Sequence, residues 1–451
     1  MRKMPRDLKE LEKLEKKFSS KKKPNVAVSI QSFIISAGLL VISILHKIIE
    51  LTISAVFLFL AFPVHIILLL RKVVTGKPVW ERRVIFGKKA APTKIAYFNI
   101  KKHLLRKLSL FYYIFMGKIS LTGIGITEYD EDKRIIGDSY IYQQKPGIFN
   151  LWYIRESSRT AYEGKLDTEL EYVYTRGYLK DFLLLLKTVP AFVYNPKADV
   201  ISNKINLFGV ELLNKRMGEA ISLIDKLVKA EQKKKIFFVN PDCLNKIFKD
   251  IGYYKILRRA DYIFPDGIGI NIAAKMLHNP LLENLNGTDM LPFLCENAVN
   301  NGSRIFLLGA KPGIAKKAKQ NLEKKFRGLQ ISGSEDGYFK PEQLAEVIKK
   351  INSAKTDILL VALGVPRQEK WIEQNLPKLD IKLAMGVGGL LDFYSGNIKR
   401  APRWMREVGL EWLYRLFQEP GRMWKRYIVG NPLFLMRVIK WKLSKQNRGE
   451  N

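Results

Sequence analysis

The chain has 451 residues, of which 47% are hydrophobic and 27% charged, and its formal net charge is +34. This length allows more than one domain of about 100–200 residues, and so large an excess of cations calls for an anionic partner, either nucleic acid or anionic lipid headgroups. Two cysteines, Cys243 and Cys295, and four scattered histidines give no secretory disulfide framework and no metal-ligand spacing.

The N-terminal part predicts attachment to a membrane. Residues 1–25 form a basic tail, and two apolar runs within residues 26–70 each approach the ~20 residues that cross a bilayer. The tail and the segment 71–89 are both basic, so the positive-inside rule places both on the cytoplasmic side. We therefore expect a membrane-embedded hairpin, or a helix that kinks at Pro63 and returns to the same face. A buried soluble hairpin is the alternative.

Residues 71–195 predict a small α/β domain. Glycine-containing turns occur at Gly76, Gly117 and Gly147, and the segment from Asp167 to Val193 has the pattern of one acidic-to-apolar helix. Asn195-Pro196-Lys197 is turn chemistry, so residues 196–202 are expected to be a linker.

Residues 203–398 alternate strands and helices in the manner of parallel βαβ units. The pattern predicts an α/β domain with a Rossmann-like parallel sheet. A basic, tryptophan-rich helical appendage is expected over residues 399–451. The expected strands are Lys235–Val239, Tyr262–Phe264 and Arg304–Leu308, with two more from Asp357 to Leu363 and from Lys382 to Met385.

Ligands of open parallel sheets bind at the carboxyl ends of the strands, which makes two residues there candidates for catalysis. Asp266 follows a strand and precedes glycines, so it could take a proton from a substrate hydroxyl; capping the next helix is the alternative. Asn240 ends the preceding strand and could orient that hydroxyl, or form an Asx-turn.

Other turns at strand ends could bind a nucleotide sugar. Gly309, Lys311 and Gly313 join a strand to a helix amino terminus, where free N–H groups can bind phosphate, although a plain βα turn is as consistent. Gly364, Gln368 and Gly388 lie in two later turns; the Gln368 amide could read a base or sugar, or cap its helix.

A diphosphate could be bound by fixed cations or by a metal ion. Arginine suits a diphosphate because its planar fork makes paired hydrogen bonds, and four arginines near the C-terminus are candidates. Asp130-Glu131-Asp132 is a weak metal motif, because no apolar strand leads directly into it. No metal or other cofactor is expected. The four candidate cations are Arg400, Arg415, Arg422 and Arg426.

Residues 203–442 resemble the WecG/TagA/CpsF glycosyltransferases. The resemblance implies inverting, metal-independent transfer of a sugar, commonly of the N-acetylmannosamine type, from a UDP donor to a polyprenyl-diphosphate-linked sugar. It places the aspartate base on Asp266, the motif asparagine on Asn240, the motif glutamine on Gln368, and the C-terminal arginines on residues 415–426. Phe238 and Asn284 depart from the threonine and arginine that are frequent in the family. The matching motifs include Asn240-Pro241-Asp242-Cys243, Pro265-Asp266-Gly267, Gly287-Thr288-Asp289, Gly364 to Trp371, Gly386 to Asp392, Arg400-Ala401-Pro402 and Gly409 to Arg415.

Residues 46–193 resemble the monotopic polyprenyl-phosphate phosphoglycosyl transferases. That family requires an adjacent Asp-Glu pair, and the expected place between Arg106 and Tyr113 has no carboxylate. In that family a Pro-Arg-Pro motif normally follows the region that corresponds to Gly123, and here it is replaced by Ile124-Gly125-Ile126. The resemblance therefore implies an inactive domain retained as a membrane anchor and lipid-binding platform.

Together these features predict a glycosyltransferase on the cytoplasmic face of the cell membrane, acting in cell-surface polysaccharide assembly. Its expected partners are a UDP-sugar, a polyprenyl-diphosphate-linked acceptor and anionic lipids. Nucleic acid is not expected, because it leaves the apolar segment unexplained, and a homo-oligomer is left open. The alternatives are a bifunctional enzyme that also makes its own lipid-linked sugar, and a non-catalytic scaffold for partner transferases.

Overall fold

The computed structural model describes residues 26–100, 103–129, 140–158, 164–194, 202–230 and 232–446. They form two compact units. The first contains residues 26–84, 93–121 and 177–179, and the second contains residues 85–92, 122–176 and everything from 180 onward. The second unit therefore combines part of the N-terminal half of the chain with the whole C-terminal half.

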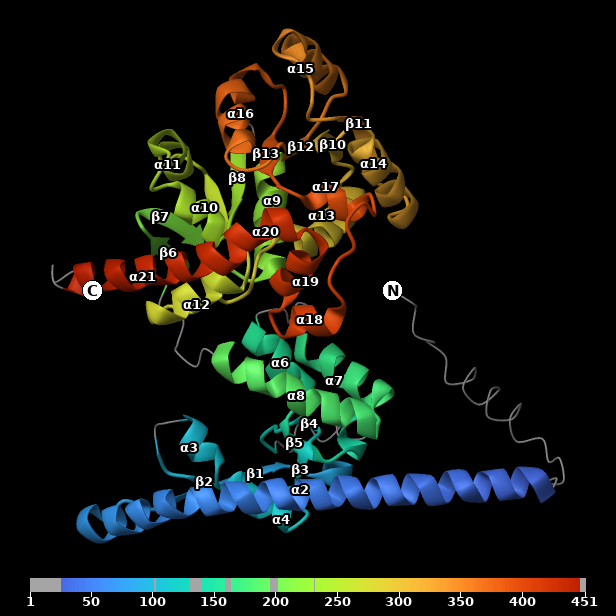
Figure 1. The fold of residues 1–451 in the computed structure, drawn as a ribbon, viewed down its shortest axis with the longest axis vertical. Coiled ribbons are helices and arrows are strands. Elements are labelled where there is room, and N and C mark those ends of the chain that lie inside the picture. The colour runs from blue at the N-terminus through green and yellow to red at the C-terminus, as the bar shows by residue number, and fades with distance from the viewer. Residues whose placement is uncertain are drawn as a thin grey trace. The chain divides into compact units, whose positions relative to one another are not determined.

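The first unit is built on one long helix, α2 (Val26–Thr75), drawn in blue in Figure 1. The predicted hairpin is wrong, because α2 runs without a break through both apolar runs and through Pro63. The residues between the runs, His46 to Glu50, contain no glycine or proline that would end a helix. Its Leu40–Thr75 part is long and apolar enough to cross a membrane.

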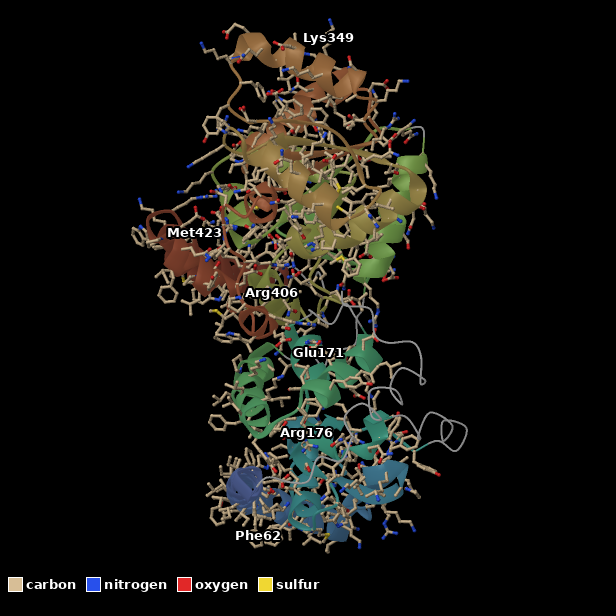
Figure 2. The ribbon with its side chains drawn as sticks, turned by 90° about the vertical axis from the view of Figure 1, so that its right-hand side faces the viewer. Phe62, Glu171, Arg176, Lys349, Arg406 and Met423 are labelled. Carbon is tan, nitrogen blue, oxygen red and sulfur yellow. The ribbon has the colours of Figure 1, made fainter. Side chains whose placement is uncertain are left out.

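One face of α2 is held by specific contacts. Glu50 is 4% exposed, and its carboxylate accepts a hydrogen bond from the Leu121 amide (2.6 Å) and pairs with Lys47 (2.6 Å). Phe57 stacks on Phe111 with ring centroids 4.4 Å apart. Elsewhere the helix presents apolar side chains to the outside: Phe62 is 61% exposed, and Figure 2 shows α2 nearly end-on with carbon-rich side chains around it.

Short elements complete the first unit and its borders. Strands β1 and β2 pair with each other, and α4 packs against α2. Their bounds are β1 (Trp80–Phe86), β2 (Pro92–Phe98), α3 (His103–Lys107), α4 (Leu110–Phe115) and β3 (Ser120–Thr122).

The second unit contains the predicted parallel sheet, which is confirmed. Its strand order is β11-β10-β12-β13-β8-β9, and every neighbouring pair is parallel. The edge strand β11 is not foreseen by the sequence pattern, because its Ser332-Gly333-Ser334-Glu335 segment has no apolar run. The strands are β8 (Lys234–Val239), β9 (Tyr262–Pro265), β10 (Arg304–Gly309), β11 (Gln330–Glu335), β12 (Ile358–Ala362) and β13 (Leu383–Gly386).

Helices cover both faces of this sheet and give three layers (Figure 1). Alternate strand residues point to opposite faces: Phe237 packs in one core and Phe238 in the other. One face is covered by α9 (Met217–Lys229), α13 (Gly287–Asn301), α14 (Ile314–Lys325) and α17 (Leu390–Tyr394). The other is covered by α10 (Pro241–Lys246), α11 (Ile251–Arg258), α12 (Ile268–Met276), α15 (Leu344–Ser353), α16 (Arg367–Asn375) and α21 (Gly430–Gln446).

The N-terminal part of the second unit is mainly helical. The single helix predicted from Asp167 to Val193 is wrong: α7 ends at Thr175 and α8 begins at Tyr178, with Gly177 at the break. Strand β4 pairs in parallel with β5, and β6 pairs antiparallel with β7. The bounds are β4 (Ile124–Gly125), β5 (Pro146–Phe149), α6 (Leu151–Ser158), α7 (Gly164–Thr175), α8 (Tyr178–Tyr194), β6 (Lys204–Leu207) and β7 (Val210–Leu213).

The segment from residue 399 is helical, as predicted, but it does not form a separate layer. Phe434 and Val438 of α21 are both 0% exposed and belong to the core on one face of the sheet. The Asn245 side-chain amide donates to the Gly430 carbonyl (2.8 Å), which fixes the start of α21. The preceding elements are α18 (Arg403–Glu407), α19 (Glu411–Gln418), α20 (Pro420–Trp424) and the π-helical turn η5 (Lys425–Val429).

Two glycines, one at the end of β10 and one in the turn after it, allow a matched test of packing. Gly309 (φ 126°) and Gly313 (φ 82°) both have positive φ, but only at Gly309 would an added Cβ meet backbone, that of Ala362 at 2.5 Å. We expect Gly309→Ala to lower the free energy of unfolding by about 1–3 kcal/mol more than Gly313→Ala, because overpacking adds to the cost of positive φ. Urea unfolding followed by tryptophan fluorescence measures the difference; equal effects would contradict this account.

Candidate active site

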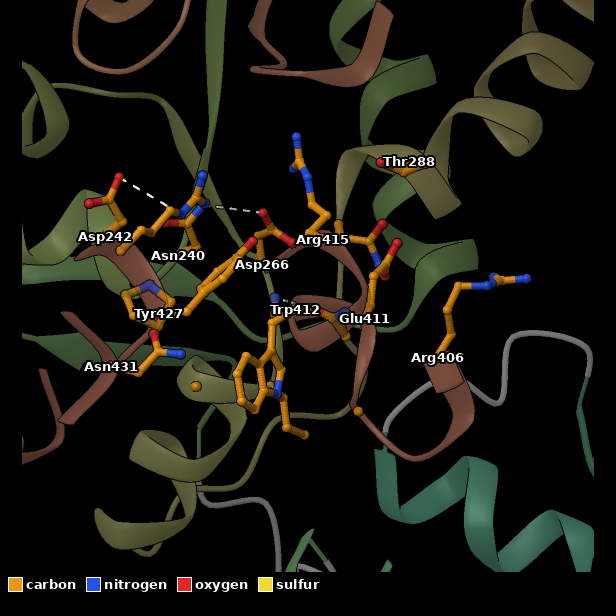
Figure 3. A pocket seen from close by; sticks show the side chains of 18 of the residues that line it. Asn240, Asp242, Asp266, Thr288, Arg406, Glu411, Trp412, Arg415, Tyr427 and Asn431 are labelled. Atoms are coloured by element: carbon orange, nitrogen blue, oxygen red, sulfur yellow. Dashed lines mark hydrogen bonds and ion pairs between the residues drawn. The ribbon is translucent and has the colours of Figure 1, made fainter. Parts of the chain in front are cut away.

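Two adjoining cavities lie at the carboxyl ends of β8, β9, β12 and β13. The first, the Trp412 cavity, is shown in Figure 3. Its lining includes Ser158, Asn240, Asp266, Asn284, Asp289, Arg406, Glu411, Trp412, Arg415, Arg426, Tyr427 and Asn431. The second, the Gln368 cavity, is lined among others by Phe238, Asn240, Asp266, Gly364, Gln368, Gly386, Gly388, Arg415, Arg422, Lys425 and Arg426.

The two cavities share a wall that contains Asn240, Asp266, Arg415 and Arg426. The first two follow adjacent strands of the sheet, and the two arginines come from the C-terminal helices. Both cavities are therefore bordered by the Asp266 carboxylate and by the same two cations.

Asp266 is held in place by its neighbours. Its amide donates to the Val239 carbonyl (2.9 Å), and its Oδ2 accepts a hydrogen bond from Asn240 Nδ2 (3.4 Å). The residue at the N-cap position of α12 is Gly267, so the capping alternative for Asp266 does not describe this structure. Asn240 makes the local contact expected of an Asx-turn, because its Oδ1 accepts from the Cys243 amide (3.2 Å) at the start of α10. Its role in orienting a substrate hydroxyl stays a prediction.

The surroundings make Asp266 more basic than an exposed aspartate. Burial raises the pKa of Asp266 and the nearby Asp289 carboxylate adds to this, while Arg426, the Asn240 hydrogen bond and Arg415 act in the opposite direction. The net displacement of the pKa is upward. A general base works best when its pKa approaches the working pH, so the environment suits a proton acceptor.

Gln368 supports a turn of the backbone. The side chain is 1% exposed; its Oε1 accepts from the Gly388 amide (2.9 Å) and its Nε2 donates to Glu369 Oε1 (2.9 Å). Burial raises the pKa of Glu369 to about 7, against the effect of that hydrogen bond. Gln368 thus fixes the glycine turn after β13, while Pro366 occupies the N-cap position of α16.

Arg415 and Arg426 supply positive charge to both cavities. The Arg415 guanidinium lies over the Phe393 ring (4.9 Å to the centroid) and that of Arg426 over the Tyr427 ring (5.4 Å). The buried Arg415 Nε has no hydrogen-bond partner among the described residues. A buried donor of this kind is costly unless a ligand completes it, so the wall is prepared for an anion.

The other two predicted arginines have different positions. Arg422 lines the Gln368 cavity, where its side chain is 61% exposed and pairs with Glu419 (3.0 Å). Arg400 is absent from the described lining of both cavities. It instead pairs with Asp289 and, at 3.4 Å, with Glu411, so it neutralises two carboxylates that line the Trp412 cavity.

Three residues predicted to bind the nucleotide sugar do not reach this site. In the described structure, Gly309, Lys311 and Gly313 line neither cavity, because β10 lies on the far side of β12 from β13 and β8. Gly309 instead permits close packing on Ala362. Asp130-Glu131-Asp132 lies outside the described residues, within which no group of three or more His, Cys, Asp or Glu side chains could hold a metal ion.

Several lining residues were not predicted as site residues. Trp412 of the tryptophan-rich C-terminal segment lines its cavity together with Tyr427, at a ring separation of 6.0 Å. Glu411 lies beside it, and the motif from Gly409 to Arg415 was the available signal for both. Tyr427 and Asn431 come from the end of η5 and the start of α21, where no sequence pattern points to a site.

The two residues that depart from the family pattern both line the site. Phe238 lies in the Gln368 cavity. Asn284 lies in the Trp412 cavity, and its Oδ1 accepts from the Gly267 amide (2.8 Å), next to Asp266. Both departures from the family pattern therefore lie in the walls of the two cavities.

Comparison with known proteins identifies the family of this chain. Residues 205–448 match the model of the Glycosyl transferase WecG/TagA/CpsF family. Similar proteins include the N-acetylglucosaminyldiphosphoundecaprenol N-acetyl-beta-D-mannosaminyltransferases of Bacillus subtilis (36% identical, 46% of this chain and 80% of the relative), Bacillus spizizenii (34%, 47% and 81%) and Staphylococcus aureus strain MRSA252 (29%, 53% and 93%). The matched region contains both cavities except for Ser158. The chain therefore belongs to the WecG/TagA/CpsF family of glycosyltransferases.

Proposed function

We propose that this enzyme transfers a sugar of the N-acetylmannosamine type from a UDP-sugar to a polyprenyl-diphosphate-linked sugar. The observation that carries the proposal is Asp266, a carboxylate of raised pKa in the wall between two cavities, with Arg415 and Arg426 beside it. The names of the relatives supply the donor sugar and the diphosphoundecaprenol-linked acceptor.

We assign the donor to the Gln368 cavity. The glycine turns at Gly364 and Gly388 let a ligand approach the backbone at the ends of β12 and β13, where parallel sheets bind nucleotides. Arg422 and Lys425 add positive charge on the same side, which suits the diphosphate of UDP.

We assign the acceptor sugar to the Trp412 cavity. Trp412 and Tyr427 offer apolar ring surfaces, and Asn284, Asn431 and Glu411 offer hydrogen-bonding groups for hydroxyls. Glu411 is a less suitable base than Asp266, because its carboxylate pairs with Arg400 and it lines only this cavity.

The chemistry follows from that arrangement. Asp266 takes the proton of the acceptor hydroxyl as its oxygen attacks the anomeric carbon of the donor from the face opposite the diphosphate. The new glycosidic bond forms as the bond from the anomeric carbon to the phosphate oxygen breaks, so the configuration inverts. The negative charge that develops on UDP is stabilised by Arg415 and Arg426, without a requirement for metal.

We further propose that α2 holds the enzyme at the membrane, with the basic segment at and after its C-terminal end, residues 71–89, on the cytoplasmic side. The exposed apolar side chains of α2 and the net charge of +34 support this. Attachment would keep the enzyme in the same surface as an acceptor with a polyprenyl tail and so raise its effective concentration.

For residues 71–195 we propose a phosphoglycosyl transferase-like domain without its own activity. The segment that should carry the Asp-Glu pair spans the end of α3 and the start of α4 and has no carboxylate between Arg106 and Tyr113. A bifunctional enzyme would require a different nucleophile, and it remains the alternative that experiment can decide.

The role of Asp266 can be tested with an isosteric amide. We expect Asp266→Asn to lower kcat by about 10²–10⁴, the usual contribution of a general base. In the wild type, the acidic limb of the kcat/KM profile should lie above that of an ordinary aspartate, because the raised pKa requires a higher pH for ionisation. Asp250→Asn is the control, since asparagine caps α11 as well as aspartate does. Near-normal turnover by Asp266→Asn would remove it from the mechanism.

The arginines should act as the diphosphate ligands. Replacing Arg422 and Arg426 together with Ala is expected to lower kcat/KM by about 10²-fold or more, as for loss of donors to a developing charge. Lys316 and Lys317, both exposed on α14, provide a control double variant with the same charge change. EDTA should leave wild-type activity unchanged. Loss of activity on chelation, with recovery on adding magnesium, would contradict the fixed-cation account.

The N-terminal domain can be tested in the full-length protein. Given a UDP-sugar and polyprenyl phosphate, the chain should release no UMP above background, because the catalytic pair is missing. The same preparation should release UDP when given a polyprenyl-diphosphate-linked sugar, which serves as the positive control. UMP release that persists in Asp266→Asn would establish a second active site.

A further inference from the structure

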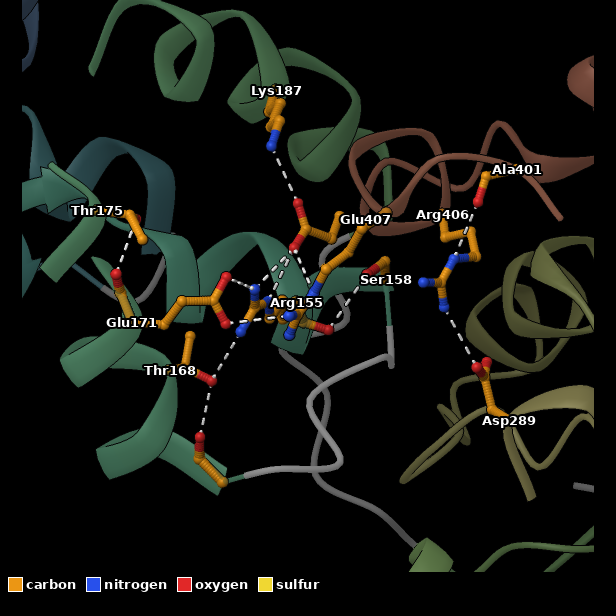
Figure 4. A network of polar contacts seen from close by, with 12 residues as sticks. Arg155, Ser158, Thr168, Glu171, Thr175, Lys187, Asp289, Ala401, Arg406 and Glu407 are labelled. Carbon is orange, nitrogen blue, oxygen red and sulfur yellow. Dashed lines mark hydrogen bonds and ion pairs between the residues drawn. The ribbon is translucent and has the colours of Figure 1, made fainter. Parts of the chain in front are cut away.

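A buried ion cluster in the second unit lies outside the two cavities (Figure 4). Its centre is Arg155 of α6, which is 1% exposed. Arg155 Nε and Nη2 both donate to Glu407 Oε1 at 2.9 Å, and Nη2 also donates to Glu171 Oε1 at 2.8 Å. A buried arginine needs such partners, because an unpaired charge away from water is strongly unfavourable.

Glu407 of α18 is the residue on which the cluster converges. It is 5% exposed; one oxygen faces Arg155, and the other accepts from Lys187 Nζ of α8 at 3.0 Å. Burial alone would raise the pKa of Glu407, but Arg155 and Lys187 outweigh it and hold the pKa below its ordinary value. A second link joins the same helices, since Arg403 of α18 pairs with Glu171 of α7 at 3.1 Å.

The cluster connects a part of the chain that lies outside the family match with a part that lies inside it. The cations Arg155 and Lys187 precede residue 205, where the family match begins, and Glu407 lies inside the match. The three helices α6, α7 and α8 thus hold a short helix of the glycosyltransferase domain through the buried pair Arg155–Glu407 and through partly exposed charges around it.

Helix α18 leads directly into the wall of the Trp412 cavity. Arg406, the neighbour of Glu407, lines that cavity, donates to Asp289 Oδ1 (3.4 Å) and donates to the Ala401 carbonyl (3.2 Å). The chain then turns at Gly409, another lining residue, into α19 with Glu411, Trp412 and Arg415. Ser158, the last residue of α6, lines the same cavity.

We infer that α6–α8 form an intramolecular brace that positions α18 and α19, and with them the wall of the Trp412 cavity, through the Arg155–Glu407 pair. Arg155 and Glu407 are positioning residues, since neither lines a cavity in the described structure. Because the effect on catalysis rests on the proposed acceptor role of this cavity, the brace reports on acceptor binding more than on donor binding. The brace gives residues 151–194 a function that needs no chemistry of their own.

The test uses the full-length protein with Glu407→Gln, Arg155→Met and the double variant. Hydrogen exchange of peptides covering residues 403–418 should become faster in each single variant, relative to the strands of the sheet. The KM for a polyprenyl-diphosphate N-acetylglucosamine acceptor should rise and kcat/KM should fall by about 10²-fold, as for a misplaced binding wall, with the KM for the UDP-sugar little changed. The double variant should lose less than the sum of the singles, because neither charge is left buried alone.

Glu211→Gln is the matched control, since Glu211 pairs with Lys204 on the surface with a side chain 58% exposed. Should Glu407→Gln fail to fold, Lys187→Gln removes one partner of Glu407 at a site where the side chain is 22% exposed. Unchanged exchange over residues 403–418 would overturn the brace. So would exchange that rises evenly through the second unit together with both KM values, which indicates a merely structural role. If the wild type transfers no sugar, the proposed function fails, while the exchange data still decide the brace.

Discussion

The active site depends on the anchoring of α21 in the core of the sheet. Phe434 and Val438 are fully buried there, and Asn245 ties the first half of the helix to the end of α10 by bonds to Gly430 and Arg437. Because residues 387–429 must connect β13 to this fixed helix, they pass over the carboxyl ends of the strands. That path brings Arg415, Arg426 and Tyr427 to Asp266, although about 150 residues separate them in sequence.

The site also depends on a balance between burial and charge. Burial disfavours the ionised form of Asp266 and Glu411, while the nearby arginines favour it. An aspartate surrounded only by apolar residues would stay protonated, and one paired tightly with arginine would be too weak a base. Asp266 has an amide, Asn240, as its direct partner, with the guanidinium groups acting through their charge. Arg400 performs the tighter neutralisation, but on Asp289 and Glu411.

The sequence was most informative where local pattern and topology coincide. Apolar runs alternating with helical segments identified five of the six parallel strands, and the rule that ligands bind at their carboxyl ends identified Asn240, Asp266, Gly364 and Gly388. The same rule misplaced Gly309, because strand order cannot be read from one strand and β10 lies one position too far along the sheet. The hairpin failed for a related reason: flanking charge indicates which side of a membrane a segment faces, but not whether the helix between the flanks is continuous. No sequence pattern could predict Tyr427 and Asn431 as site residues, because only the packing of α21 against the sheet brings them to the cavity.

The shared wall between the cavities has a consequence for the order of events. Arg415 and Arg426 line both cavities, so under the proposed assignment a donor diphosphate in the Gln368 cavity would screen part of the positive charge that reaches the Trp412 cavity. Under that assignment, binding of one substrate changes the affinity for the other. The donor changes the affinity for the acceptor by the same factor as the acceptor changes the affinity for the donor, because the coupling free energy between two sites is reciprocal. UDP that stays bound after transfer would then change the rate at which the elongated lipid product dissociates. Product release, as well as the chemical step, can therefore limit kcat.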